Sequence, residues 1–225
     1  MLSKCCNCLF FFCVCLPCWI FGAEIAVVTM AIGKEYQKTV QKTIENKRAY
    51  CEKHQYDFVY GDMILDASRP IAWSKILLIL EVMETSECEW IFWSDADSLI
   101  MNMDICLEDI IDENYNFILT RDLNALNTGQ FLIRNCEWSR TFLQAVYNRT
   151  DCIHHPWWEN QGVIKILEEY PEYLSLTKIL PQRVMNSYAK EVIGNLEAHT
   201  FQSQDFIIHF AGVHWGARSC SLKSA

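Results

Sequence analysis

Two aspartates separated by one residue are the clearest candidates for chemistry in this chain. Asp95 and Asp97 follow the strongly apolar run 90–93, and the intervening Ala96 is small. Two neighbouring carboxylates repel each other unless a cation lies between them, and hard divalent cations prefer oxygen ligands. Such a cation could bridge the phosphates of a nucleotide diphosphate and offset the charge of a leaving diphosphate. The pair alone also fits a solvated turn, but its position after a buried strand favours metal binding.

A single histidine near the end of the chain is the second candidate. His209 lies in the apolar segment 207–212, which ends at a glycine and has the character of a buried strand. A core histidine with satisfied hydrogen bonds is one interpretation. If this strand ends near Asp97, the neutral imidazole could instead be a third ligand for a manganese-like cation.

The elements that must position these residues alternate between strand and helix patterns. Strands are predicted over 24–30, 57–62, 89–97, 116–122, 128–135 and 205–212, and helices over 34–54, 72–85, 137–147 and 159–169. This alternation predicts an α/β fold with a mainly parallel central sheet flanked by helices. Ligands of such sheets bind beyond the carboxyl ends of the strands. The residues therefore expected near one rim are Thr29, Tyr60, Asp95, Asp97 and His209.

Composition limits the classes of partner. The chain has 225 residues, half of them hydrophobic, which suits one domain with a large core. Its net charge is −9 and it has no run of Lys and Arg, which argues against a nucleic-acid partner. A phosphorylated small substrate remains compatible, because a divalent cation can supply the positive charge.

Residues 1–23 differ from the rest of the chain. Six of the twelve cysteines lie among the first eighteen residues, at spacings that do not suit a zinc site, so we interpret them as acylated or core-like. Residues 9–23 are almost wholly apolar and follow Lys4, which predicts a signal or membrane anchor, with a buried extension as the alternative. The folded domain is then expected over 24–225, in the lumen of a secretory compartment. The sequon at Asn148 is compatible with that route.

Five segments, in their order and spacing, resemble glycosyltransferase family 34. They are residues 73–75, 90–102, 126–139, 159–162 and 209–212. The resemblance extends from about Ile25 to Cys220. It implies a GT-A (Rossmann-like) fold and a retaining α-glycosyltransferase with Mn²⁺, or another divalent cation, and a UDP- or GDP-sugar donor. It also implies a glycan as the acceptor.

The resemblance also implies roles for individual residues. The metal ligands would be Asp95, Asp97 and His209. The residues placed along the nucleotide sugar would be Thr29, Lys75, Ser94, Thr128, Gly129 and His214. The residues beside the reacting carbon would be Asn127, Glu159 and Gln161. Two positions depart from the family pattern, because Asn160 stands where relatives carry an acid and His214 stands where they carry another basic residue.

Several of these residues have a purely structural alternative. Residues 127–129 fit a turn between strands, Glu159 fits the first-turn acid of a helix, and Lys75 fits a side chain that extends to solvent. Trp157 and Trp158 suit either packing or stacking on an acceptor sugar.

The function that we expect is transfer of a hexose or pentose from a nucleotide diphosphate sugar to a glycan hydroxyl. A catalytically silent relative that binds sugars and a metal-dependent phosphohydrolase are the alternatives.

Overall fold

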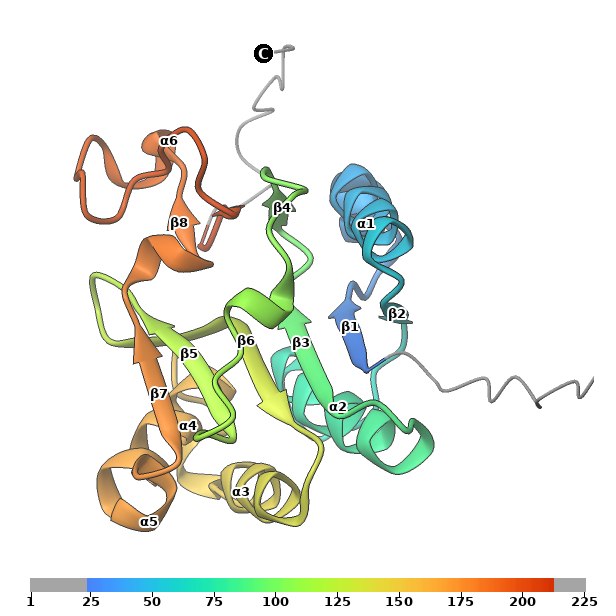
Figure 1. Cartoon of the computed structure of the whole chain (residues 1–225). Helices are drawn as coiled ribbons and strands as arrows, with labels where there is room; N and C mark the ends of the chain where they lie inside the picture. Colours follow the sequence, from blue (N-terminus) through green and yellow to red (C-terminus); the bar gives the residue numbers. More distant parts are fainter. Residues whose placement is uncertain (1–23, 213–225) are drawn as a thin grey trace, which may run out of the picture.

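A six-stranded sheet lies at the centre of the computed structural model, which describes residues 24–212 (Figure 1). The strands, in order across the sheet, are β2 (Asp57–Gly61), β1 (Ile25–Met30), β3 (Trp90–Ser94), β6 (Leu126–Arg134), β5 (Phe117–Arg121) and β7 (Thr177–Leu180). Strand β6 runs antiparallel to its neighbours β3 and β5, and the other pairs are parallel. The predicted α/β class and mainly parallel sheet are confirmed.

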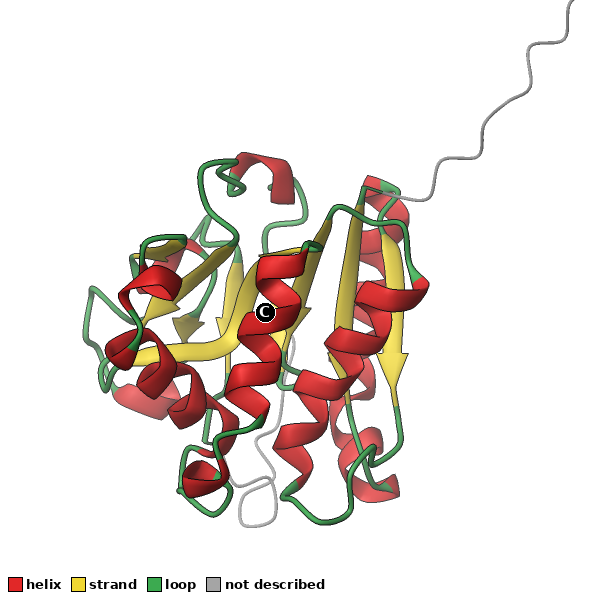
Figure 2. Ribbon diagram, turned by 90° about the horizontal axis from the view of Figure 1, so that it is seen from below, coloured by secondary structure: helices red, strands yellow, loops and turns green. Residues whose placement is uncertain are grey.

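Helices cover both faces of this sheet (Figure 2). The four longer ones are α1 (Lys34–His54), α2 (Ser74–Thr85), α3 (Glu137–Tyr147) and α4 (Trp158–Glu169). Helices α2, α3 and α4 pack against one face through one apolar core, and α1 packs against the other through a second core. Because both faces are covered, β1 and β3 are apolar at nearly every position, as expected for buried parallel strands.

Shorter elements complete the described chain. The helical ones are η1 (Ile71–Trp73), η2 (Leu107–Asp109), η3 (Thr150–Cys152), α5 (Pro171–Leu174), η4 (Gln182–Val184) and α6 (Lys190–Ile193). A second sheet has three short strands in the order β4 (Ser98–Ile100), β9 (Ile207–His209) and β8 (Ser187–Tyr188).

The pairing of β4 with β9 brings two distant parts of the chain together. Ser98 lies opposite His209 in this antiparallel pair, and the backbone N–H of Phe210 donates to the carbonyl of Asp97 at 3.0 Å. Helix α1 supports β4 from outside, because the Asn46 side chain bonds both the N–H and the C=O of Ile100. The turn after β3 is thereby fixed beside the end of β9.

The structure differs from the predicted elements at several boundaries. Strand β3 ends at Ser94, and the N–H of Ser98 bonds the carbonyl of Asp95 at 3.2 Å, so the two aspartates lie on a turn rather than in a strand. Strand β6 begins at Leu126, so residues 127–129 are part of the sheet and the turn interpretation is wrong. Strands β4, β7 and β8 were not predicted, because two to four residues are too few to show a period.

Two predictions fall outside the described residues. They concern the N-terminal segment 1–23 and His214. Between residues 24 and 212, none of the helices has the combination of length and apolar character that a membrane crossing requires.

Candidate functional site

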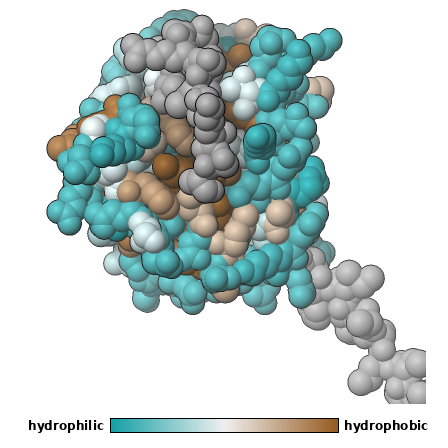
Figure 3. All heavy atoms as spheres, turned by 90° about the horizontal axis from the view of Figure 1, so that it is seen from above, coloured by the Kyte–Doolittle hydropathy of each residue, from teal (hydrophilic) through white to brown (hydrophobic). Residues whose placement is uncertain are grey.

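A cavity of about 830 Å³ opens at the carboxyl edge of the large sheet. Seen from above, this side of the molecule presents apolar residues within a hydrophilic surround (Figure 3). The walls come from the ends of β1 and β3, the start of β6, the starts of α2 and α4, and the second sheet. Asp95, Asp97 and His209 line it together, as expected for residues at one rim, whereas Thr29 and Tyr60 do not line it.

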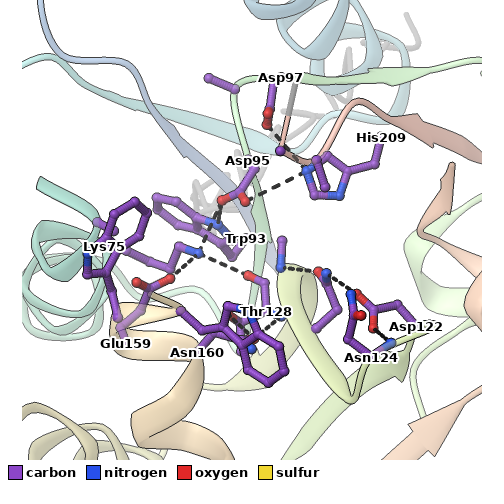
Figure 4. A pocket seen from close by; sticks show the side chains of 18 of the residues that line it. Lys75, Trp93, Asp95, Asp97, Asp122, Asn124, Thr128, Glu159, Asn160 and His209 are labelled. Carbon is purple, nitrogen blue, oxygen red and sulfur yellow. Dashed lines mark hydrogen bonds and ion pairs between the residues drawn. The ribbon is translucent and has the colours of Figure 1, made fainter. Parts of the chain in front are cut away.

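The two aspartates and the histidine converge on one point (Figure 4). The Nε2 atom of His209 lies 3.3 Å from Oδ1 of Asp97 and 3.8 Å from Oδ2 of Asp95. One ligand atom from each residue lies within 4.8 Å of the other two. Two carboxylate oxygens and one imidazole nitrogen form a donor set that suits Mn²⁺ and similar cations. The residues present therefore fit the cation that the sequence predicts.

Asn186 fixes the orientation of the His209 ring. Its amide nitrogen donates to Thr120 Oγ1 at 3.1 Å, so its oxygen faces the imidazole and accepts from Nδ1 of His209 at 2.7 Å. A proton on Nδ1 leaves the lone pair of Nε2 directed at the aspartates. This is the tautomer in which the ring can ligate a metal.

Gly129 leaves the space that the His209 ring occupies. A Cβ atom at this position would lie 2.3 Å from Cε1 of His209, well inside van der Waals contact. The carbonyl of Gly129 also accepts the backbone N–H of Asp95 at 2.8 Å. Gly129 therefore helps to position both Asp95, through its carbonyl, and the His209 ring, through the space it leaves.

A buried lysine lies on the α1 side of the acidic turn. Lys47 is fully buried and its Nζ atom donates to the carbonyl of Ser98. Burial lowers the pKa of Lys47 to about 7, and the nearby Asp97 and Asp95 oppose that shift. For Asp97, burial raises the pKa, whereas Lys47 and a His209 ring that carries a second proton would lower it, and together they would hold the pKa below its ordinary value.

A second buried lysine bridges Asp95 to helix α4. Nζ of Lys75 lies 2.8 Å from Oε1 of Glu159, 3.1 Å from the carbonyl of Thr128 and 3.2 Å from Oδ1 of Asp95. Burial would lower the pKa of Lys75, but the two carboxylates raise it above its ordinary value. The interpretation of Lys75 as a solvent-directed side chain is wrong, since it is 5% exposed.

Glu159 is buried at the start of α4 and lines the cavity. Burial raises the pKa of its carboxyl group, although Lys75 opposes this shift. Its Oε2 atom has no hydrogen-bond partner among the described residues, which is unusual for a buried carboxylate oxygen.

Asn160 and Asn127 hold the start of β6 in shape. Oδ1 of Asn160 accepts from both N and Oγ1 of Thr128, at 2.8 and 2.9 Å, and its Nδ2 atom donates to the carbonyl of Leu126. A carboxylate could not make that last bond. Asn127 donates to Asp122 and accepts from the N–H of Gly129.

Sequence reasoning missed three residues that shape this cavity. Asp122 and Tyr188 line it and both bond the Asn127 side chain, while Asn186 holds His209 from behind. Asp122 carried a signal, because it is an acid at the end of a predicted strand. Tyr188 and Asn186 carried none, since β8 is only two residues long.

Other predicted residues lie away from the cavity. Thr29 is fully buried in β1, and its hydroxyl has no partner among the described residues. Ser94 is buried and its hydroxyl pairs with that of Ser98 at 2.9 Å. Gln161 follows Asn160 in α4 but is not part of the cavity wall. The ligand-binding roles predicted for these three residues stay predictions.

Known proteins resemble this chain in sequence. An alpha-1,2-galactosyltransferase from Schizosaccharomyces pombe is 24% identical over 81% of this chain and 58% of its own length. A probable xyloglucan 6-xylosyltransferase 3 from Arabidopsis thaliana is 35% identical over 51% of this chain and 26% of its own length. The chain thus spans between about a quarter and somewhat over half of these two relatives.

Solved structures resemble it in fold. A glycosyltransferase involved in the glycosylation of the major capsid of PBCV-1 superposes with a TM-score of 0.67 at 19% identity, covering 83% of this chain and 93% of that one. The galactosyltransferase LgtC superposes with a TM-score of 0.55 at 12% identity, covering 83% and 87%. These are GT-A glycosyltransferases, so the predicted GT-A fold is confirmed.

The sequence description of one family covers nearly the whole described domain. It matches residues 22–113 and 110–220, which include the acidic turn, the start of α4 and His209. The chain therefore belongs to the galactosyl transferase GMA12/MNN10 family, glycosyltransferase family 34.

Proposed function

We propose that this chain is a metal-dependent, retaining α-glycosyltransferase that moves a sugar from a nucleotide diphosphate to a glycan hydroxyl. The observation that carries the proposal is the convergence of Asp95, Asp97 and His209 on one point of the cavity wall. A cavity of about 830 Å³ also suits a ligand of nucleotide-sugar size, since small-molecule sites span roughly 300–1,000 Å³.

A bound divalent cation would neutralise the diphosphate and stabilise the negative charge that grows on it as the sugar bond breaks. The residues of the chain prepare that position. Asn186 holds the His209 tautomer, Gly129 leaves room for the ring, and Lys75 holds Asp95 through an ion pair. Such preorganisation means that little rearrangement is needed when the donor binds.

The carboxylates of the cavity are poor candidates for a nucleophile, which favours a retaining mechanism without a covalent intermediate over one with it. Besides the metal pair, the described acids that line the cavity are Asp122 and Glu159. Asp122 accepts four hydrogen bonds, from two backbone N–H groups and two side chains. Glu159 is ion-paired with Lys75, which weakens it as a nucleophile. We therefore favour attack by the acceptor on the face that the diphosphate leaves, with a phosphate oxygen taking the proton.

Glu159 has a different role in this proposal. Glu159 lines the cavity on the opposite side of Asp95 from Asp97, and its buried Oε2 atom has no hydrogen-bond partner among the described residues (Figure 4). A sugar whose diphosphate is held at the acidic turn would extend toward this oxygen, which would accept a hydrogen bond from a sugar hydroxyl.

Family membership favours sugar transfer over phosphoester hydrolysis. The catalytically silent alternative depends on Asn160, which stands where the family resemblance implies an acid and whose three hydrogen bonds give it a structural function. Binding of a nucleotide sugar by a protein that neither transfers nor hydrolyses it would support that alternative.

The test is donor turnover with Mn²⁺ for the wild type and for Asp97→Ala, using Asp109→Ala as the matched control. Asp109 is an exposed acid away from the cavity. We expect Asp97→Ala to lose nearly all transfer and hydrolysis, and Asp109→Ala to retain both. Equal turnover in wild type and Asp97→Ala would refute the metal role, and NMR of the product's anomeric carbon would decide between retention and inversion.

We also propose a secretory location with the catalytic domain in the lumen of the Golgi or a related compartment. The apolar residues 9–23 and the exposed Asn148 of the sequon support it. Treatment with an endoglycosidase should shift the wild-type band on a gel and leave Asn148→Gln unchanged. The absence of a shift for protein made in eukaryotic cells would count against this location.

A further inference from the structure

Large apolar side chains are exposed around the mouth of the cavity. Trp157 and Trp158 are 42% and 44% exposed, and Ile71 and Leu123 are exposed to a similar extent. They come from three separate segments, namely η1, the connection between β5 and β6, and the start of α4, yet all four line the same cavity. Apolar side chains that gather at the rim of a pocket mark a ligand surface more often than isolated exposed residues do.

The two tryptophans belong to an ordered turn. His155 accepts the backbone N–H of Trp157 on Nδ1 at 3.1 Å and the N–H of Trp158 on its carbonyl at 2.9 Å. The rings of His155 and Trp157 also meet edge to face, with centroids 5.8 Å apart. The N–H of His155 in turn bonds the carbonyl of Cys152 at 3.1 Å. The indole rings are therefore presented by a fixed backbone.

Trp158 has a strained backbone conformation. Its φ angle is +42°, in the left-handed region that bulky side chains rarely adopt. Such strain persists where the surrounding structure enforces it, and it is concentrated at functional sites. The next residue, Glu159, is buried against Lys75, so this strained position separates an exposed aromatic ring from the interior of the cavity.

We propose that Trp157 and Trp158, with Leu123, form the subsite for the glycan acceptor and stack on the apolar face of a pyranose ring. This inference rests on the proposed transferase function. A pyranose ring presents C–H groups on its faces and hydroxyls around its edge, which matches an aromatic platform beside polar groups. Thr128 and Asn160, which line the same cavity, supply such polar groups.

The position of the platform favours the acceptor over the nucleotide base. Trp158 directly precedes Glu159, which lies across Asp95 from Asp97 (Figure 4). The cavity wall also contains Met30, Ile32 and Tyr36 near the end of β1, and Tyr36 packs against the cluster that includes Ala96 of the acidic turn, which provides a separate apolar surface for a base. With the diphosphate at the acidic turn, the acceptor must approach from the side where the donor sugar points.

The experiment compares acceptor and donor kinetics for Trp157→Ala and Trp158→Ala, with Tyr170→Ala as the control. Tyr170 is a similarly exposed aromatic residue at the far end of α4 and does not line the cavity. Mannohexaose and cellohexaose serve as probes, both as acceptors and as ligands in saturation-transfer NMR. We expect each Trp variant to raise the acceptor KM about tenfold, with donor KM and donor hydrolysis unchanged. Tyr170→Ala should behave as the wild type.

A third variant distinguishes a ligand platform from simple packing. In Trp158→Gly the positive φ costs nothing, so we expect a higher melting temperature together with the same loss of acceptor binding. Trp157→Phe should restore most of the acceptor affinity lost in Trp157→Ala.

Two results would overturn the inference. A raised donor KM with an unchanged acceptor KM would assign the rings to the nucleotide, and variants with wild-type acceptor binding would remove the subsite altogether. Failure of the proposed function gives a different pattern, because the wild type would then neither transfer nor hydrolyse any nucleotide sugar. Saturation-transfer NMR still tests the acceptor subsite in that case, because the inference requires oligosaccharide binding that is lost in Trp157→Ala and Trp158→Ala.

Discussion

Adding one methyl group at Gly129 should abolish metal binding while the fold is retained. The new Cβ atom of Gly129→Ala would lie 2.3 Å from Cε1 and 3.0 Å from Nδ1 of His209. Ordinary contact begins near 3.4 Å, so the ring has to move by about 1 Å. Productive metal–ligand distances hold within about 0.2 Å, so a displacement of this size removes His209 from a shared coordination sphere.

The substitution should affect both the stability of the fold and its stabilisation by Mn²⁺. Inserting a methyl group into a packed site typically costs about 1–3 kcal/mol, which lowers the melting temperature by roughly 2–4 °C per kcal/mol in a domain of this size. Mn²⁺ at a hundred times its dissociation constant should stabilise the wild type by about 2.7 kcal/mol. The Gly129→Ala protein should therefore melt lower without the cation and gain little or nothing when it is added.

The assay is thermal unfolding with chelator or with Mn²⁺, and the control is Gly162→Ala. The same methyl group at Gly162 would meet Val146 and Trp73 at 3.2 and 3.3 Å, contacts that small shifts can relieve. Gly162→Ala should keep the full Mn²⁺-dependent increase. If Gly129→Ala keeps it as well, then His209 is not a ligand and the geometric reasoning is wrong.

Three further changes test other parts of the site. Asn186→Leu should weaken Mn²⁺ binding about 10–100-fold in titration calorimetry, because the His209 tautomer is no longer held; unchanged affinity would refute this role. Lys75→Met leaves Glu159 buried without its countercharge, so the free energy of unfolding measured in urea should fall by about 3–5 kcal/mol. The double variant Lys75→Met/Glu159→Leu should recover most of that stability. In chelator, the free energy of unfolding of Lys47→Met should exceed that of the wild type, and this difference should shrink as the pH rises from 7 to 10. The reason is that Lys47 in the folded wild type releases its proton near pH 7, while the unfolded chain keeps it to about pH 10.5, so the wild type gains stability over this range. A difference that stays constant with pH would contradict the low pKa of Lys47.

Long elements with a clear apolar period were predictable from the sequence. The helices predicted over 34–54 and 137–147 have the same bounds in the structure, and β1 and β3 lie within the predicted strands. Their burial is set locally, because each presents an apolar face or an apolar run to the sheet core. The acidic turn was predictable for the same reason, since an apolar strand that ends in two carboxylates is informative by itself.

Contacts between distant short segments were not predictable from periodicity. Asp97 meets His209 only because β4 pairs with β9, and each of these strands has three residues. The strand-end rule placed both residues near one rim, and the family resemblance then implied that His209 is a ligand of the same cation. Asn186 and Tyr188 act through β8, which is shorter still, and their roles depend on hydrogen bonds that no local pattern encodes.

Polar residues at the start of β6 illustrate a second limit. Asn127 and Thr128 resemble turn residues, because asparagine and threonine commonly bond nearby backbone in turns. In the structure their side chains bond Asp122, Tyr188 and Asn160, which lets the strand begin earlier than predicted. Tertiary hydrogen bonds thus override the local preference.

The most direct test of the account is a crystal structure with Mn²⁺ and a nucleoside diphosphate, using anomalous scattering to locate the metal. The account predicts one anomalous peak bonded to Asp95, Asp97 and Nε2 of His209, with diphosphate oxygens completing its coordination. A diphosphate bound in the cavity with no metal between these three side chains, or a metal held elsewhere, would contradict it.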